Sequence, residues 1–403
     1  IGLAYLLLNL IALFAVKNYM GMQRYDAFLQ TFSDFEPPIS FLVPAYNEEL
    51  TIESTVRSLL QLSYSNYEII VINDGSTDNT LPLLIDKFEL LRIPESYNRK
   101  LETKAVRGFY LSTVYPNLKV IDKENGGKAD ALNAGLNAAM YPIFCSMDSD
   151  SILERNSLRR VVRPFLNDQR TIAAGGTIRI INGSEVKEGH LLKAGLPRKL
   201  LVRFQIIEYL RAFLFGRIGW TPINCLMVLS GAFSLFRKDK VIEAGGYKTG
   251  TVGEDMELVV RLHRLLRRKG EPYRITFVPD PICWTEAPAD LATLRRQRIR
   301  WQRGLGESLA LNLGLLFHPR GGLVGWVAFP FMLVFEFLGP FIEIAGYAFV
   351  TIGLVMGFVS YQIALLFFAL AVGLGVLISV VSLLLEEISF HIYGEVRQIL
   401  GLF

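Results

Sequence analysis

Carboxylates follow two short apolar runs of the sequence, at the points where strands would end. Asp74 comes just after the run Tyr67–Ile72, and Asp148 and Asp150 follow the run Pro142–Ser146. Two carboxylates that flank one residue at a strand exit can hold a divalent cation together with phosphate oxygens, the partial protein cage that Mg²⁺ prefers. Asp-Gly turns and helix N-caps use the same residue types, so the spacing alone leaves these interpretations open.

A lysine and two acids stand at the starts of two helical patterns. Lys128 opens the pattern Ala129–Met140, where a cation opposes the helix dipole. A phosphate on the exposed N–H groups would remove that conflict, and a solvated lysine is the alternative. Glu254 and Asp255 begin the pattern Met256–Lys269, where acids are favoured in any case. The functional interpretation makes Asp255 a general base that takes a hydroxyl proton.

Gln297, Arg300 and Trp301 are spaced i, i+3 and i+4, which places them on one face of a helix. A guanidinium beside an indole can grip a diphosphate while the ring offers a stacking surface for a sugar. Anchoring of the tryptophan in a membrane interface is the competing interpretation.

The sequence lacks the motifs of several other enzyme classes. No GxGxxG follows a strand-like run, no HExxH or GxSxG is present, and the four histidines are scattered. Three widely spaced cysteines give no disulfide framework and no metal-binding pair. Dinucleotide oxidoreductases, zinc enzymes and serine hydrolases are therefore disfavoured. An isoelectric point near 8.8 is too mild to indicate a nucleic-acid partner.

The middle of the chain alternates between strand-like and helix-like patterns. The 403 residues are 51% hydrophobic with a net charge of +4, which excludes a disordered chain. The alternation predicts an α/β fold with a mainly parallel sheet, whose ligands lie at the carboxyl ends of the strands. The expected strands are Ile39–Val43, Tyr67–Ile72, Leu118–Ile121, Pro142–Ser146, Thr171–Ile181, Leu226–Phe236 and Arg274–Val278. The expected helices between the early strands are Leu50–Leu62, Leu81–Leu90 and Ala129–Met140.

Apolar segments at both ends predict membrane-spanning helices. Residues 1–16 carry no charge, and Leu323–Leu385 is long enough for two or three spans, with breaks at Gly339-Pro340 and Ser360-Tyr361. Within that block Glu336 and Glu343 are expected to face a translocation path or a polar partner. The basic residues after the first segment place the polar middle in the cytoplasm.

Two further segments have a mixed basic and apolar composition that suits helices on an anionic leaflet, namely Lys199–Arg217 and Leu291–Arg303. Ordinary surface helices are the alternative. The expected organisation is a transmembrane helix (1–20), a nucleotide-binding half (21–198), an acceptor half with interfacial helices (199–304), and interfacial and transmembrane helices (305–403).

Seven motifs in this order resemble the family 2 membrane glycosyltransferases, the group of cellulose, hyaluronan, chitin and poly-N-acetylglucosamine synthases. They are PAYNEE (44–49), NDGSTD (73–78), GGKADALNAG (126–135), DSD (148–150), SGAF (230–233), GED (253–255) and QRIRW (297–301). The resemblance covers Ile39–Gly304, and SGAF followed by Arg237-Lys238 is most similar to the poly-N-acetylglucosamine synthases. Gly253 departs from the pattern, since many relatives have Thr there, and this puts the shape of the acceptor pocket in doubt.

The resemblance implies a GT-A fold and a role for each matching residue. The donor nucleotide-sugar would be bound by Tyr46, Glu48, Asp74, Lys128, Asp148, Gln297 and Arg300. Mg²⁺ or Mn²⁺ would be held by Asp148 and Asp150 with the diphosphate. The acceptor would be lined by Ser230, Gly231, Glu254 and Trp301, with Asp255 as the catalytic base.

The implied function is an inverting transfer of a sugar from a UDP-sugar to a growing β-linked polysaccharide, with translocation of the polymer. Such an enzyme would be a multi-pass protein of the inner (plasma) membrane with a cytoplasmic catalytic domain. Its partners would be the UDP-sugar, a polysaccharide or glycolipid acceptor, the lipid bilayer and an accessory membrane subunit, but no nucleic acid. The alternatives are a non-processive transferase that adds one sugar to a lipid-linked acceptor, and a receptor or scaffold that has lost turnover.

Overall fold

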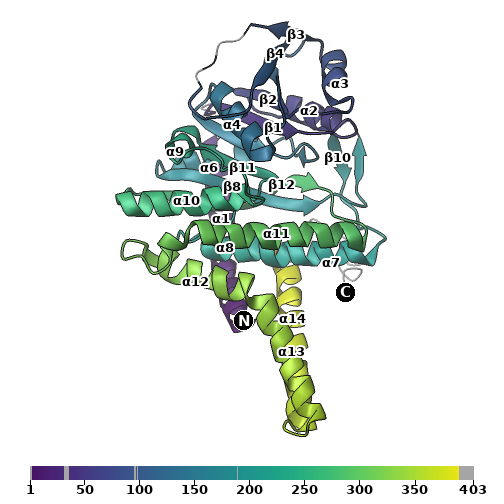
Figure 1. Ribbon diagram of the computed structural model, residues 1–403, viewed down its shortest axis with the longest axis vertical. Helices are drawn as coiled ribbons and strands as arrows, with labels where there is room; N and C mark the ends of the chain where they lie inside the picture. The colour runs from purple at the N-terminus through teal and green to yellow at the C-terminus, as the bar shows by residue number, and fades with distance from the viewer. Residues whose placement is uncertain (1, 31–35, 95–96, 98, 188, 390–403) are drawn as a thin grey trace.

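The computed structural model describes residues 2–30, 36–94, 97, 99–187 and 189–389. Figure 1 shows a sheet domain at one end of the molecule, helices that lie across its base, and helices that project away from it. This arrangement separates a polar domain from an apolar stem, as the distribution of charge along the chain predicts.

The sheet has ten strands in the order β3-β4-β5-β2-β1-β6-β11-β8-β12-β7. Its parallel centre consists of β5 (Leu118–Lys123), β2 (Tyr67–Asn73), β1 (Ile39–Ala45) and β6 (Ile143–Met147). Every residue of β1 is buried, which is typical of a parallel strand covered on both faces. The flanks are β3 (Leu90–Ile93), β4 (Val106–Ser112), β11 (Phe233–Arg237), β8 (Thr171–Ile180), β12 (Arg274–Thr285) and β7 (Ile152–Leu153).

Antiparallel pairing in the flanks qualifies the prediction of a mainly parallel sheet. Strand β11 runs antiparallel to both β6 and β8, and β4 runs antiparallel to β3 and β5. Because β11 lies between β6 and β8, the expected halves 21–198 and 199–304 share one sheet.

The register brings the motif loops to one edge of the sheet. Ala45 at the end of β1 is opposite Asn73 at the end of β2, and Asn73 is opposite Asp122 of β5. Met147, the last residue of β6, is opposite Phe233, the first residue of β11. The loops that leave β1, β2, β5 and β6 therefore meet the loop that enters β11.

The prediction of a strand over Leu226–Phe236 is wrong in its first part, because only the residues from Phe233 onward pair in the sheet. Of the apolar residues before it, Met227 and Val228 pack in one cluster with Met256 and Val260 of helix α10 (Glu254–Lys269). The Leu226 carbonyl contacts Nε2 of His263 at 2.8 Å. A side chain thus takes the place of the backbone N–H of a neighbouring strand.

Helices cover the sheet and fill the crossovers. Helix α4 packs on β1 and β2 and begins after Gly127, whose φ of 85° favours glycine. The helices are α2 (Ile52–Leu60), α3 (Thr80–Lys87), α4 (Lys128–Ala138), α5 (Ser157–Val161), α6 (Arg163–Asn167), α9 (Lys238–Glu243) and α10. A separate hairpin pairs β9 (Glu185–Lys187) with β10 (His190–Lys193).

Two helical segments lie across the base of the sheet domain (Figure 1). One comprises α7 (Leu200–Glu208), the π-helical turn η1 (Tyr209–Phe215) and α8 (Gly216–Trp220), and the other is α11 (Leu291–Leu311). Both helices predicted from the basic-apolar composition are present, and α11 continues beyond the predicted end. Their contact with a membrane remains a prediction.

The apolar stem contains two helices that are long and apolar enough to span a membrane, within Gly2–Gly21 and Tyr361–Glu387. A third candidate is a bent pair, Val324–Phe337 with Gly339–Val355, at 49° to each other. The elements are α1 (Gly2–Gln30), η2 (Leu313–Leu315), η3 (Val324–Ala328), α12 (Phe329–Phe331), η4 (Met332–Phe337), α13 (Gly339–Val355) and α14 (Tyr361–Ser389). Both predicted breaks are confirmed, and residues 390–403 of the expected C-terminal segment lie outside the described residues.

Polar contacts attach the stem helices to each other and to the sheet. The Tyr5 hydroxyl donates to Glu336 at 2.5 Å, so the polar partner predicted for Glu336 is present. Glu343 is exposed on α13, and its predicted place on a translocation path stays a prediction. Arg179 of β8 and Glu386 of α14 form a buried ion pair at 2.6 Å, which joins the last helix to the sheet.

His263 fixes the helix that carries the acids at 254 and 255. Its Nε2 donates to the Leu226 carbonyl, since a carbonyl only accepts, and its Nδ1 therefore accepts from the Tyr273 hydroxyl at 2.6 Å. Acceptance by Nδ1 requires the neutral imidazole, and burial lowers the pKa of His263 to about 4.

This buried histidine predicts a loss of stability in acid. Between pH 6.5 and 4 the unfolded chain binds a proton that the folded chain excludes, so the free energy of unfolding should fall by about 3 kcal/mol. Urea unfolding in detergent, followed by circular dichroism from pH 7.5 to 4, measures this. His263→Gln should remove that part of the pH dependence, whereas His318→Gln should leave it. An unchanged profile in His263→Gln would contradict the assignment.

Candidate active site

The loops after β1 and β2 interlock at the sheet edge. The Asn47 side chain accepts from the Thr77 backbone N–H at 2.8 Å, and the Glu48 N–H donates to the Thr80 hydroxyl at 2.8 Å. Tyr46, half exposed, and Glu48 follow the end of β1, as predicted from the motif. Their contact with a nucleotide remains a prediction.

Asp74 anchors the turn that starts α4. Its carboxylate accepts from Nζ of Lys123 at 2.6 Å and from the N–H groups of Gly126 and Gly127 at 3.0 and 2.7 Å. The side chain is almost completely buried, and Lys123 also binds Asp130 at 2.6 Å. The observed contacts of Asp74 thus position the glycine turn, whereas a contact with uridine is a separate prediction.

Lys128 lies at the centre of the site. Its Nζ is 2.5 Å from Asp148 Oδ1 and 3.4 Å from Glu254 Oε1. Burial would lower the pKa of Lys128, but the charges of Asp148, Glu254 and Asp255 outweigh it and raise the pKa well above its usual range. In this structure carboxylates compensate the cation at the start of α4, the position where the sequence suggested a phosphate.

Asp148 and Asp150 leave the end of β6 as an acidic pair. Burial, together with the charges of Asp148 and Glu48, raises the pKa of Asp150 to about 6. A divalent cation would relieve this repulsion, and oxygen donors of this kind suit Mg²⁺ or Mn²⁺. No group of three or more metal-binding side chains occurs in the described part of the chain. The pair fits a cation whose remaining ligands come from substrate oxygens and water.

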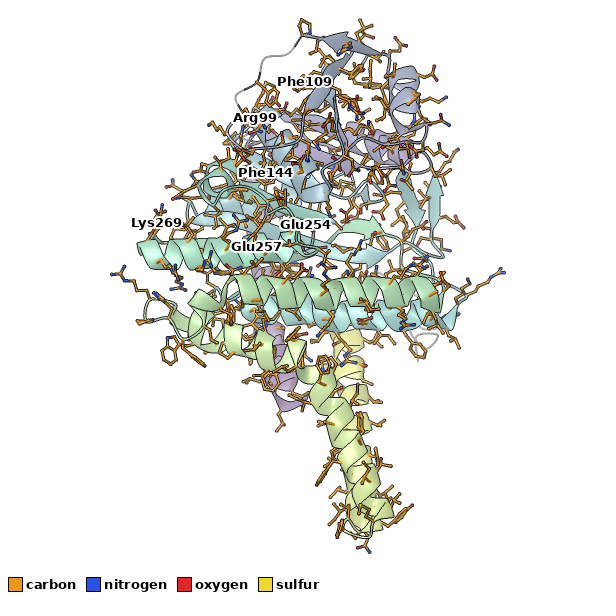
Figure 2. The ribbon with its side chains drawn as sticks, viewed as in Figure 1. Arg99, Phe109, Phe144, Glu254, Glu257 and Lys269 are labelled. Carbon is orange, nitrogen blue, oxygen red and sulfur yellow. The ribbon has the colours of Figure 1, made fainter. Side chains whose placement is uncertain are left out.

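Asp255 lies against the loop before β11. Its Oδ2 accepts from the Gly231 N–H and its Oδ1 from the Met256 N–H, both at 2.8 Å. A Cβ added to Gly231 would lie 2.9 Å from Nζ of Lys128 and 3.1 Å from Asp255 Oδ2. Gly231 therefore lies between the lysine and the carboxylate, and Ser230 precedes it. Figure 2 shows Glu254 at the junction of the sheet domain and the helices below it.

Helix α11 approaches the acids at a pair of glycines. A Cβ on Gly253 would lie 2.8 Å from Gly304 Cα, and the reverse distance is 2.9 Å. The Ser308 hydroxyl donates to the Gly304 carbonyl at 2.7 Å and approaches the Gly253 carbonyl at 3.3 Å. This contact explains the departure at Gly253, because a threonine side chain there would collide with the backbone of α11.

The face of α11 that contains Gly304 also contains the predicted residues Gln297, Arg300 and Trp301. The Arg298 guanidinium lies 4.2 Å from the Trp301 ring centroid and pairs with Glu208 of α7 at 2.6 Å. Gln297 Oε1 is buried without a hydrogen-bond partner among the described residues, and Arg300 is exposed.

The structure thus brings together the residues predicted from five motifs, although it does not test their roles. The clustered residues are Glu48, Lys128, Asp148, Asp150, Gly231, Glu254 and Asp255. Trp301 lies one turn before Gly304 on α11, the residue at which this helix contacts Gly253 beside the acids. Among the described residues, neither Arg300 nor Tyr46 forms a hydrogen bond or an ion pair with the cluster.

Two arginines near the site were missed. Arg217 is buried, its charge acts on Asp255, and burial lowers its pKa to about 10. Arg298 lies inside the QRIRW motif, so its position in the sequence could have identified it as a candidate site residue. For Arg217, the basic and apolar composition of Lys199–Arg217 predicts only a helix on an anionic leaflet.

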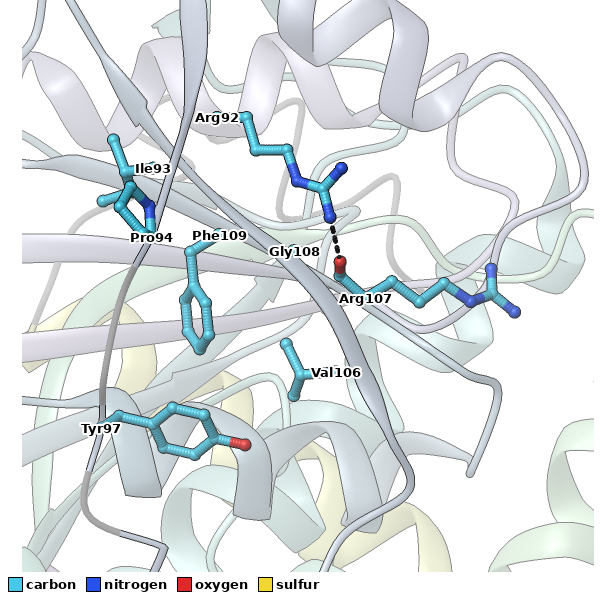
Figure 3. A pocket seen from close by; sticks show the side chains of 8 residues that line it. All are labelled: Arg92, Ile93, Pro94, Tyr97, Val106, Arg107, Gly108 and Phe109. Carbon is cyan, nitrogen blue, oxygen red and sulfur yellow. Dashed lines mark hydrogen bonds between the residues drawn. The ribbon is translucent and has the colours of Figure 1, made fainter.

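A hollow of about 660 Å³ lies at the opposite flank of the sheet, beside the β3–β4 hairpin (Figure 3). Arg92 crosses it and donates to the Arg107 carbonyl at 2.7 Å, and Tyr97 and Phe109 line it. None of the predicted site residues lines this hollow, so it is not a candidate for the chemistry at the sheet edge.

Comparison with known proteins identifies related sequences. The family described as Glycosyl transferase family 2 matches residues 40–243, and Glycosyl transferase family group 2 matches residues 143–379. The poly-beta-1,6-N-acetyl-D-glucosamine synthase of Staphylococcus aureus (strain COL) is 33% identical over 273 residues, 67% of this chain and 55% of that protein. The protein of the same name from Staphylococcus epidermidis is 29% identical over 302 residues, 72% of this chain and 62% of that protein. The chain thus spans little more than half the length of these relatives.

A solved structure confirms the predicted GT-A-like α/β fold. The mannosyltransferase PcManGT from Pyrobaculum calidifontis, in complex with GDP-Man and Mn²⁺, has a TM-score of 0.59 over 93% of this chain and 97% of that chain. At 17% sequence identity this likeness concerns the fold alone.

The glycine contact predicts an unusual cost for a small substitution. Gly304→Ala adds a methyl group 2.9 Å from Gly253 Cα and should destabilise the protein by about 1–3 kcal/mol through overpacking. Gly373→Ala, in a helix where a Cβ meets nothing within 4 Å, should be neutral or stabilising. Urea unfolding of both variants measures the difference. Equal stability of the two variants would show that α11 does not pack on Gly253.

Proposed function

Because the chain belongs to glycosyl transferase family 2, we propose that it transfers a sugar from a UDP-sugar to the end of a growing β-linked polysaccharide. The observation that carries this proposal is the position of Lys128, paired with Asp148 of the strand exit and with Glu254 beside Asp255. A donor pocket and an acceptor pocket would meet at that lysine. The name of the staphylococcal relatives favours N-acetylglucosamine as the sugar.

The donor side would bind the nucleotide diphosphate. Asp148 and Asp150 would hold Mg²⁺ or Mn²⁺, which neutralises charge on the departing diphosphate when bound. With the metal ion neutralising the charge of the carboxylates, the ammonium group of Lys128 would be free to move from Asp148 to a phosphate oxygen of the donor. Tyr46, Glu48 and Asp74 follow β1 and β2, where the uridine would lie at the carboxyl edge of the sheet.

On the acceptor side, Asp255 would act as the general base. The acceptor hydroxyl oxygen forms a bond to the anomeric carbon of the donor as the bond from that carbon to the UDP oxygen breaks. The hydroxyl proton passes to Asp255, and the electron pair of the broken bond leaves with UDP. Attack opposite the leaving group inverts the anomeric centre. The N–H groups of Gly231 and Met256 hold the carboxylate in a fixed orientation for this step.

The acceptor sugar would lie between Ser230-Gly231 and α11. Trp301 would supply a stacking surface for a sugar ring. The unpaired Gln297 Oε1 would accept a hydrogen bond from a hydroxyl group of that sugar. Arg300 would approach the diphosphate when the donor binds. Arg298, which covers the indole, would have to share or leave that ring as the sugar enters.

The apolar stem supports a place in the plasma membrane with the sheet domain in the cytoplasm. The candidate spans and the basic residues beside them suit this orientation. Elongation and passage of the polymer through the membrane, with an accessory membrane subunit, complete the proposal. We propose that the sheet domain is divided by function into a nucleotide-binding half (21–198) and an acceptor half (199–304), which share one sheet.

The base assignment predicts a specific kinetic defect. Asp255→Asn should lower the rate of UDP release from UDP-N-acetylglucosamine by about 10²–10⁴-fold, since the proton acceptor is lost. Binding of UDP with Mn²⁺, measured by calorimetry on the detergent-purified chain, should remain within about twofold. Asp239→Asn, the same change at an exposed carboxylate, is the matched control.

The product distinguishes polymer synthesis from single transfer. A high-molecular-mass polysaccharide after incubation in bilayers supports the proposed function, whereas lipid carrying one or two sugars favours the non-processive alternative. If Asp255→Asn released UDP at the wild-type rate, the proposed role of Asp255 as the base would be wrong, whichever product is formed.

A further inference from the structure

Four arginines gather where the end of α10 meets the loop before η3. They are Arg264, Arg267, Arg268 and Arg320, and together they form what we name the arginine corner. Arg264 donates to the Leu311 carbonyl at 2.9 Å, and Arg268 to the Gly314 carbonyl at 3.1 Å. Arg320 donates to the carbonyl of Arg268 at 3.1 Å. Backbone carbonyls therefore hold three of these cations, and Arg267 donates to the Tyr273 hydroxyl at 3.1 Å. The corner lies next to the helix end at Lys269 in Figure 2.

The arginine corner has no acidic partner among the described residues. On the same helix, Arg261 pairs with Glu257 at 2.9 Å, and Lys269 pairs with Glu243. No carboxylate of the described chain forms an ion pair with any of the four arginines, although burial and the nearby charge of Arg268 lower the pKa of Arg264. The charge of Glu257 also acts on Arg264, but it forms no ion pair with it. Four clustered guanidinium groups without an ion-pair partner among the described residues favour a bound anion.

An exposed apolar surface lies in the same loop and the helix after it. We name it the apolar wedge; its members are between 50% and 54% exposed and are Leu313, Phe317, Leu323 and Trp326. Phe317 has a φ of 52°, rare for a residue with a side chain, and its ring lies 5.2 Å from that of Trp326. The Trp326 indole donates to the His318 carbonyl at 3.2 Å, which fixes the ring at the surface.

The wedge stands at the start of a candidate membrane segment. The bent pair begins at Val324, between Leu323 and Trp326 of the wedge, and Arg320 precedes it by four residues. Tryptophan and basic side chains at the end of a span are typical of the headgroup level of a bilayer. Guanidinium groups bind phosphate through paired N–H donors, and apolar side chains enter the boundary of the acyl chains.

We propose that the arginine corner and the apolar wedge form a binding site for an anionic phospholipid, with the headgroup phosphate on the arginines and the acyl chains along the wedge. A soluble polyanion would use the cations but leave the wedge in water, which favours a lipid as the occupant. This site is separate from the acidic cluster around Lys128 and does not depend on the proposed sugar transfer.

Quenching of Trp326 by brominated lipids tests this site. The full chain is reconstituted in phosphatidylcholine vesicles that contain an equal minor fraction of either brominated phosphatidylglycerol or brominated phosphatidylcholine. The signal of Trp326 is obtained by difference from Trp326→Phe. Brominated phosphatidylglycerol should quench more strongly. Arg268→Gln/Arg320→Gln should reduce that preference by about 25-fold, since each of the two basic groups near an anionic leaflet contributes about fivefold.

Two control variants separate charge from folding. Arg99→Gln/Arg107→Gln removes one charge from the sheet domain at the position labelled Arg99 in Figure 2 and one from strand β4, and it should leave the preference unchanged. Arg268→Lys/Arg320→Lys keeps the charge but loses the paired N–H donors, so it should retain more of the preference than the glutamine variant and less than the unmodified chain. Equal quenching by both brominated lipids in the unmodified chain would overturn the proposal. Loss of the preference on adding inorganic phosphate at constant ionic strength would do so too, because it indicates a free-anion site.

Discussion

The ion pairs of Lys128 are the interaction on which the candidate site depends. One ammonium group joins Asp148 at the sheet edge to Glu254 at the start of α10, over more than a hundred residues of sequence. The carboxylates around it outnumber this single cation, and the raised pKa of Asp150 reports the resulting repulsion. A site of this kind has too much negative charge to bind a nucleotide diphosphate unless a metal cation is added. The electrostatics therefore support the proposed metal-assisted donor pocket.

Glycines allow the parts of the site to approach one another. Gly231 leaves space for Lys128 beside Asp255, and Gly253 lets the backbone of α11 contact the loop before the acids. The distances at Gly231 and Gly253 leave little room for any side chain. This explains why a glycine stands at position 253.

Much of the architecture could be predicted because it depends on local pattern. The buried central strands, the breaks of the stem at Gly339 and Tyr361, and the helix that starts at Glu254 all follow from apolar runs, prolines and acids near one another in the chain. The strand prediction fails over Leu226–Ala232 because apolar residues such as Met227 are buried by packing on α10, which no local pattern reveals. The anchoring contacts of Asp74 and the cover of Trp301 by Arg298 likewise depend on long-range packing.

The most direct test of the central claim is a double-mutant cycle of Lys128→Met and Glu254→Gln, with the free energy of Mn²⁺-dependent UDP binding measured by calorimetry. If Lys128 connects the donor and acceptor sides, the two substitutions should be non-additive by about 1 kcal/mol or more, as for residues in one charge network. Additive effects, within about 0.5 kcal/mol, would show that the two residues act independently. That result would contradict the account of a single site centred on the lysine.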